Sequence, residues 1–228
     1  APVVETRQGA LIGFTEGDTH VWCGIPYAAP PVGPWRWRSP RPPARWDGVR
    51  PATAFSASSW QSSESCQELG GGDPGQFSED CLYLNVWSPV ARADPLPVMV
   101  WLHGGGFTLG AGGLPPYNGR ALAKRGTVVV TINYRLGHLG FFAHPALEGE
   151  EERVVHNFAL LDQIQALEWV RDNIASFGGD PENITVFGES AGARSVLSLM
   201  ASPLARGLFH KAIVQSGYTL PDTPRGQA

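Results

Sequence analysis

The chain has 228 residues, of which 43% are hydrophobic and 10% aromatic, so it can bury a substantial core, and its length fits one large domain. Its net charge is −4 and it has no basic tract, which argues against nucleic acid as a partner. It has no run of about 18 apolar residues, so we expect no membrane span. Its cysteines and histidines match no metal-binding spacing, so we expect neither a metal nor another cofactor.

The first quarter of the chain reads as short strands followed by a proline-rich loop. Residues 3–6 and 10–14 flank a turn signal and predict a hairpin, and residues 20–23 form another extended run. The many prolines of residues 25–51 exclude a helix or a central strand there. The same segment holds four large aromatic residues, Tyr27, Trp35, Trp37 and Trp46. Their apolar bulk predicts an ordered loop packed over the core.

The rest of the chain alternates between apolar runs and helical periodicity. Residues 52–80 are rich in serine and glycine and predict a loop. We expect strands at 82–87, 98–102, 127–132, 183–187 and 211–215, and helices at 118–125, 157–174 and 191–200. This alternation predicts an α/β fold, with a mostly parallel central sheet and helices on both faces.

A sharp strand–turn–helix junction lies at Gly188-Glu189-Ser190-Ala191-Gly192, which matches the nucleophile-elbow pattern Gly-x-Ser-x-Gly. Its glycines let neighbouring backbones approach closely while the serine hydroxyl stays exposed. The following helix directs its N-terminal N–H groups at the position where negative charge would develop. Taken alone, the pentapeptide also fits a glycine-rich turn with a capping serine.

A second motif favours the catalytic interpretation of the elbow. The strand predicted at 98–102 runs into His103-Gly104-Gly105-Gly106-Phe107, a glycine-rich loop of the kind that supplies half of an oxyanion hole. Adjacent glycines leave their backbone N–H groups uncovered and able to converge on an oxyanion. Two motifs in this order, each after a strand, indicate a nucleophile at Ser190.

Two cysteines flank a polar segment that has no apolar periodicity. A disulfide between Cys66 and Cys81 would close a loop of about 15 residues and add about 3 kcal/mol of stability. Two buried thiols fit the same spacing. Cys23 lies in an apolar run and is expected to be a buried free thiol.

These motifs together resemble the type-B carboxylesterase/cholinesterase family of α/β-hydrolases. The most specific shared signatures are Glu79-Asp80-Cys81-Leu82 and the elbow, and further matches lie at 24–28, 104–107, 133–137, 161–163 and 177–181. The resemblance implies an α/β-hydrolase fold, incomplete without C-terminal sequence. Residues 1–228 are then the N-terminal portion of a single α/β-hydrolase domain.

The resemblance also implies a reaction, the hydrolysis of small carboxylic esters through an acyl-enzyme. It makes Ser190 the nucleophile and the N–H groups of Gly105, Gly106 and Ala191 the oxyanion donors. Glu189 becomes a charged neighbour that supports the electrostatics of the catalytic histidine.

Further positions follow from the same resemblance. Phe107 and Ser216 are expected to contact substrate, and Ser216 also matches a buried polar network beside the nucleophile. The resemblance implies a Cys66–Cys81 disulfide, and a bonded pair would favour a secreted or periplasmic location. The segment between these cysteines has no tryptophan, which argues against a quaternary-ammonium substrate.

The triad acid and histidine of the family lie beyond the end of this chain, because the order is serine, acid, histidine. After Ser190 the candidates are His210, which is expected to be a surface or packing residue, and Asp222. His103 is not expected to be the base. We therefore expect a C-terminal chain or segment to complete the site. The alternatives are an inactive fragment and a non-catalytic adhesion protein on the same scaffold, and the intact Ser190 argues against the latter.

Overall fold

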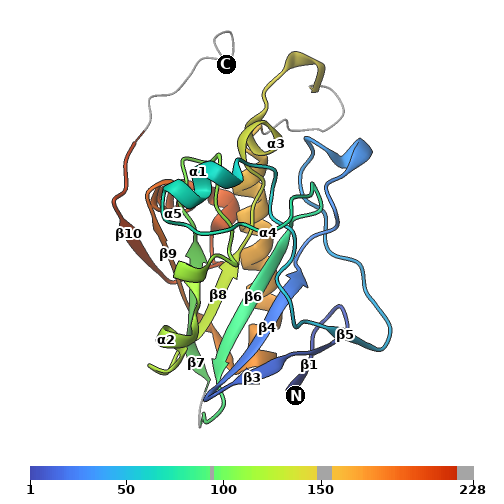
Figure 1. Cartoon of the computed structure of the whole chain (residues 1–228), viewed down its shortest axis with the longest axis vertical. Helices are drawn as coiled ribbons and strands as arrows, with labels where there is room; N and C mark the ends of the chain where they lie inside the picture. The colour runs from blue at the N-terminus through green and yellow to red at the C-terminus, as the bar shows by residue number, and fades with distance from the viewer. Residues whose placement is uncertain (93–94, 148–155, 220–228) are drawn as a thin grey trace.

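The computed structural model describes residues 1–92, 95–147 and 156–219, which form a sheet covered by helices (Figure 1). The central sheet has seven strands in the order β10-β9-β7-β8-β6-β4-β3. These strands are β3 (Phe14–Glu16), β4 (Thr19–Pro26), β6 (Tyr83–Pro89), β7 (Leu96–Leu102), β8 (Val128–Ile132), β9 (Gly179–Glu189) and β10 (Lys211–Gln215).

The predicted α/β class is confirmed, and the sheet is mixed rather than mostly parallel. Strands β8, β7, β9 and β10 run parallel, whereas β3, β4, β6 and β8 pair antiparallel with one another in that order. The difference arises in the N-terminal third, where strands follow one another through loops, since parallel neighbours need crossover connections. The parallel half carries the predicted nucleophile.

A second, three-stranded sheet contains the predicted N-terminal hairpin. Strands β1 (Val3–Glu5) and β2 (Ala10–Ile12) pair antiparallel, and β5 (Val49–Pro51) adds alongside β2. The proline-rich segment between β4 and β5 is an ordered loop, as predicted. Its Tyr27 is fully buried, and the Trp46 indole N–H donates to the Ala10 carbonyl at 2.9 Å.

Five α-helices are described: α1 (Ser63–Glu68), α2 (Arg120–Ala123), α3 (Gly137–Phe141), α4 (Phe158–Asn173) and α5 (Ala191–Ala201). The 3₁₀ helices are η1 (Gly33–Trp35), η2 (Pro115–Tyr117), η3 (Pro145–Leu147), η4 (Ile174–Phe177) and η5 (Pro203–Ala205). Helix α4 crosses behind the sheet in the view of Figure 1. Within the described ranges, no helix is long and apolar enough to cross a membrane.

Strand β8 shows why the sheet is covered on both faces. Its Val128 and Val130 belong to the main core, which includes Leu167 of α4. The intervening Val129 packs in a smaller cluster with Ala123 of α2. Because successive side chains of a strand point to opposite faces, α4 and α2 lie on opposite faces of the sheet.

The register of the parallel strands brings the two sequence motifs together. Leu102, the last residue of β7, is paired with Gly188 in β9, and Glu189 is paired with Gln215 in β10. The glycine loop therefore leaves β7 beside the turn that follows β9. Ligand sites of open α/β sheets lie at this carboxyl edge of the strands.

Candidate active site

Ser190 lies in a strained turn between β9 and α5. Its φ of 55° and ψ of −119° are rarely adopted by a residue with a side chain and cost about 1–3 kcal/mol. Two backbone hydrogen bonds hold the turn in this conformation. The Ser190 N–H donates to the Gln215 carbonyl at 3.0 Å, and the Arg194 N–H donates to the Ser190 carbonyl at 2.9 Å. This is the geometry that the elbow motif predicts.

The two elbow glycines are required by close backbone contacts. A Cβ atom on Gly188 would lie 2.6 Å from the carbonyl oxygen of Gly192. A Cβ atom on Gly192 would overlap the carbonyl oxygen of Leu102, at the end of β7. The turn therefore packs directly against the strand that leads into the glycine loop.

The glycine loop approaches Ser190 closely. A Cβ atom on Gly104 would lie 3.3 Å from the Ser190 Cβ. The loop folds back on itself, since the Gly105 carbonyl accepts hydrogen bonds from the N–H groups of Thr108 at 3.0 Å and Leu109 at 3.1 Å. Gly105 has a φ of +114°, and a Cβ atom there would overlap the Leu109 carbonyl oxygen.

Three backbone N–H groups near the serine are unpaired within the described part of the chain. No acceptor bonds the N–H groups of Gly105, Gly106 or Ala191. Ser190, Gly105 and Gly106 line one pocket, and Ala191 follows Ser190 at the first position of α5. Unpaired N–H groups beside a nucleophile can stabilise an oxyanion.

The pocket has a volume of about 400 Å³, which suits a small molecule. Glu189 and Ser190 form one wall, and Glu189 has an exposed side chain. The remaining lining residues come from three segments and are Gly104, Gly105, Gly106, Thr108, Leu109, Gly110, Leu114, Tyr117, Cys66, Leu69 and Gly71. The sequence analysis did not identify the contributions of α1 and η2. The N-cap serine Ser62, which accepts from the Ser65 N–H, was a usable signal for α1.

His103 is held in a neutral form away from catalysis. Its side chain is fully buried, and its Nδ1 lies 2.7 Å from the Gly104 carbonyl oxygen, so Nδ1 carries the proton and donates. The ring stacks on Tyr134 with 4.3 Å between centroids. Burial lowers the pKa of His103 to about 4. These contacts agree with the expectation that His103 is not the base.

His210 has a structural role at the start of β10. Its Nδ1 accepts a hydrogen bond from the Ile184 backbone N–H at 3.0 Å, and the backbone N–H of His210 donates to the Ile184 carbonyl at 2.8 Å. Ile184 lies in the middle of β9, six residues before Ser190. His210 is exposed, which agrees with the expected surface or packing role. Asp222 lies outside the described residues, and no histidine among the described residues lines the pocket.

The structure brings neither predicted substrate contact into the pocket. Phe107 turns its ring edge-to-face onto Phe141 at 5.1 Å, and its carbonyl accepts from the Gly137 N–H at 2.7 Å. Ser216 is exposed just after β10 and has a φ of 54°. The predicted roles of Phe107 and Ser216 therefore stay predictions.

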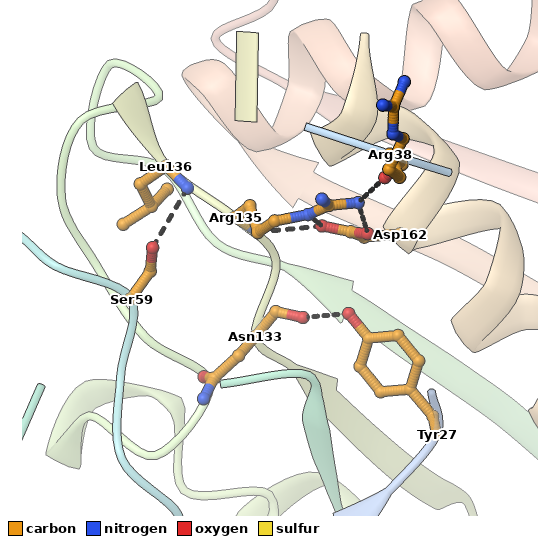
Figure 2. A network of polar contacts seen from close by, with 7 residues as sticks. All are labelled: Tyr27, Arg38, Ser59, Asn133, Arg135, Leu136 and Asp162. Carbon is orange, nitrogen blue, oxygen red and sulfur yellow. Dashed lines mark hydrogen bonds and ion pairs between the residues drawn. The ribbon is translucent and has the colours of Figure 1, made fainter. Parts of the chain in front are cut away.

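A buried ion pair supports the segment behind the glycine loop (Figure 2). Arg135 forms two bonds to Asp162, Nε to Oδ2 at 2.9 Å and Nη2 to Oδ1 at 2.7 Å, and both side chains are at most 3% exposed. The Arg135 N–H adds a third bond to Asp162, and Nη2 also donates to the Arg38 carbonyl. The Gly137 N–H donates to the carbonyl of Phe107, so this segment is connected to the glycine loop.

The predicted disulfide is wrong, because Cys66 and Cys81 are both free and buried. They pack in different clusters: Cys66 contacts Ala111 and Leu114, whereas Cys81 lies in the main core. Burial raises the pKa of the Cys81 thiol to about 12. The condition for a secreted or periplasmic location is therefore not met. Cys23 is a buried free thiol, as expected.

Comparisons with known proteins identify the family. Residues 1–223 match the carboxylesterase family. The chain is 52% identical to para-nitrobenzyl esterase of Bacillus subtilis (strain 168) over 216 residues, which cover 94% of this chain and 43% of that protein. It is 51% identical to fumonisin B1 esterase of Sphingopyxis macrogoltabida, covering 94% of this chain and 39% of that one.

Solved structures show the same relationship. A PNB esterase structure superposes with a TM-score of 0.88 at 50% identity, covering 94% of this chain and 44% of that one. A carboxylesterase of Geobacillus stearothermophilus superposes with a TM-score of 0.84 at 50% identity. The match covers 92% of this chain and 42% of that one. The chain thus spans less than half the length of these relatives. The α/β-hydrolase fold is shared, and the chain belongs to the carboxylesterase family.

Proposed function

We propose that this chain is the nucleophile-bearing part of a serine hydrolase that cleaves small carboxylic esters. One observation carries the proposal: Ser190, in a strained turn, lines one pocket with Gly105 and Gly106 and is followed by Ala191, and the N–H groups of these three neighbours are unpaired among the described residues. The relatives named above are esterases, which supports the same reaction class.

The proposed reaction proceeds through an acyl-enzyme. The Ser190 Oγ attacks the ester carbonyl carbon while a histidine takes its proton, and the resulting oxyanion accepts hydrogen bonds from the three N–H groups. The intermediate collapses, the C–O bond to the alcohol breaks, and the alcohol leaves with the proton from the histidine. Water then attacks the acyl carbon while the same histidine accepts its proton. The bond from the acyl carbon to the Ser190 Oγ breaks, the histidine returns the proton to Oγ, and the carboxylic acid is released.

The histidine and the triad acid are proposed to come from a C-terminal chain or segment. Residues 1–228 would then be the N-terminal portion of a single α/β-hydrolase domain. The exposed edge strand β10 supports this arrangement, since its Ile213 and Val214 are 43% and 38% exposed. Glu189 lines the pocket beside Ser190, and we propose that its carboxylate stabilises the positive charge of that histidine.

Two further contacts with substrate are proposed at the rim of the site. Phe107 follows the oxyanion glycines directly, and Ser216 follows Gln215, whose carbonyl accepts from the Ser190 N–H.

The test replaces the nucleophile in the complete polypeptide that contains this chain. We expect Ser190→Ala to lower kcat for a p-nitrophenyl ester by a factor on the order of 10⁴ or more. Ser198→Ala is the matched control, because Ser198 lies on α5 outside the pocket and bonds the Arg194 carbonyl. Near-normal turnover in Ser190→Ala would overturn the proposed function.

A further inference from the structure

We propose that Gln61 is a positioning residue that holds the oxyanion loop in its working shape, an inference that rests on the proposed function. The Gln61 side chain forms a reciprocal pair of hydrogen bonds with Gly110, which is 49 residues away in sequence. Its Nε2 donates to the Gly110 carbonyl at 2.8 Å, and its Oε1 accepts from the Gly110 N–H at 2.8 Å. The Nε2 also donates to the Ser59 carbonyl at 3.1 Å.

Gly110 is the position through which this clamp acts on the loop. Its φ is +111°, and a Cβ atom there would overlap the His103 ring and lie 2.7 Å from the Gly104 carbonyl oxygen. Gly110 therefore packs directly on the residues that begin the loop. The Gly105 carbonyl accepts hydrogen bonds from Thr108 and Leu109, which come just before Gly110 in the chain. A shift of Gly110 would therefore move the oxyanion donors as well.

Only an amide of this length satisfies the contacts. Gly110 presents one donor and one acceptor, and the Ser59 carbonyl is a further acceptor. A glutamate would place a negative charge against two carbonyl oxygens, and an asparagine is one methylene too short. The side chain is half-buried, so water competes only partly for these bonds.

Ser62, the residue after Gln61, connects the Gln61–Gly110 clamp to the opposite wall of the pocket. Ser62 caps α1, and Cys66 and Leu69 at the end of that helix line the pocket together with Gly105 and Ser190. Gln61 thus sets the distance between the α1 wall and the oxyanion donors. A positioning role in catalysis follows, since an oxyanion hole works only when its donors are placed before the reaction.

The first experiment compares Gln61→Met with Gln67→Met in the complete polypeptide. Gln67 is an exposed residue of α1 whose amide bonds only Ser63 among the described residues, so it is a matched control. We expect Gln61→Met to lower kcat by about tenfold to 100-fold, with KM changed by less than about threefold. We expect exchange of the Gly110 amide hydrogen to accelerate by about tenfold or more. The control should change neither quantity.

A second variant gives a signature that a purely structural role would not produce. In Gln61→Glu, a protonated carboxyl group again offers one donor and one acceptor to Gly110. The ratio of kcat in this variant to kcat in the parent should therefore rise as pH falls toward about 4.3, the ordinary pKa of glutamate. Taking the ratio at each pH cancels the titration of the catalytic histidine.

The outcomes separate this inference from the proposed function. Unchanged Gly110 exchange, an equal loss of kcat in Gln67→Met, or a flat pH ratio in Gln61→Glu would each overturn the role of Gln61, even in an active esterase. Faster exchange without ester turnover in the parent would confirm the clamp and overturn the esterase assignment, and with it the catalytic effect of Gln61.

Discussion

The pocket around Ser190 has one fixed side and one open side. On the fixed side, the glycine loop is held by Gln61 and by the segment that carries the Arg135–Asp162 ion pair. On the open side, β10 lies at the edge of the sheet (Figure 1). Its Ile213 and Val214 are 43% and 38% exposed, and the exposed Ser216 follows it. The proposed nucleophile and oxyanion donors thus lie within this chain, whereas no histidine among its described residues lines the pocket.

The comparison shows which parts of the proposed mechanism depend on local structure. The strained turn at Ser190 needs only β7, β9, β10 and α5, all of which are present. A catalytic histidine needs a position on the open side, where β10 is the last described strand. Substitutions on the fixed side should therefore lower stability strongly both in the 228-residue chain and in the complete polypeptide. The effect of substitutions on the open side should depend on whether further sequence covers β10.

The largest effect on stability is expected from the buried ion pair. Asp162→Asn leaves Arg135 buried without its counter-charge and should lower the free energy of unfolding by about 3–5 kcal/mol. Asp172→Asn, which weakens the pairs with the exposed Arg7 and Arg171, should cost less than about 1 kcal/mol. Urea unfolding of both variants measures the difference. Equal losses would show that the fixed side is not held by this pair.

The next effect concerns the packing of the elbow against β7. Gly192→Ala should destabilise the fold by about 3 kcal/mol, since the added methyl group overlaps the Leu102 carbonyl and this outweighs the better helix propensity of alanine. Gly70→Ala is the control, because Gly70 has a φ of +81° but no atom within 4 Å of the added group. It should cost about 1 kcal/mol. Similar thermal unfolding of the two variants would contradict the close contact.

A pH dependence of comparable or smaller size is expected from His103. Its pKa is lowered to about 4 in the folded chain, against an ordinary value near 6.5, so below pH 6.5 the unfolded chain binds more protons. Stability should be complete above pH 6.5 and decline by up to about 3 kcal/mol as pH falls to about 4. Urea titrations across this range measure the slope. His103→Asn should flatten it, and an unchanged slope would assign the effect to other groups.

The smallest effect is expected on the open side. Ile213→Ala should cost less than about 1 kcal/mol in the 228-residue chain, since this side chain is 43% exposed. In the complete polypeptide the same change should cost about 2 kcal/mol or more if C-terminal sequence covers β10. Chemical unfolding of both forms gives the comparison. The same small cost in both would show that β10 stays an open edge.

The sequence predicted most of the elements that position the site. The apolar runs of β7, β8 and β9 and the long α4 have clear patterns, and the elbow motif was supported by the glycine loop that follows the strand before it. Helices α1 and α3 were missed because they are short, and their residues, rich in serine and glycine, have weak helix propensity.

The errors in the site have a common physical cause. The disulfide was implied by the family resemblance, whereas Cys66 packs with Ala111 and Leu114 and Cys81 lies in the main core, which spacing alone does not indicate. The Gln61–Gly110 clamp joins two loops that have no shared pattern in sequence. Side-chain contacts between irregular segments depend on tertiary placement, and no local period encodes them.

The central claim is that Ser190 is the nucleophile and that its base lies outside the 228 residues. The most direct measurement is intact mass after incubation with a fluorophosphonate, which labels an activated serine, followed by mapping of the adduct. We expect a single adduct on Ser190 in the complete polypeptide and none on the folded 228-residue chain alone. Rapid labelling of Ser190 in the isolated chain, or an adduct on another residue of the complete polypeptide, would contradict the account.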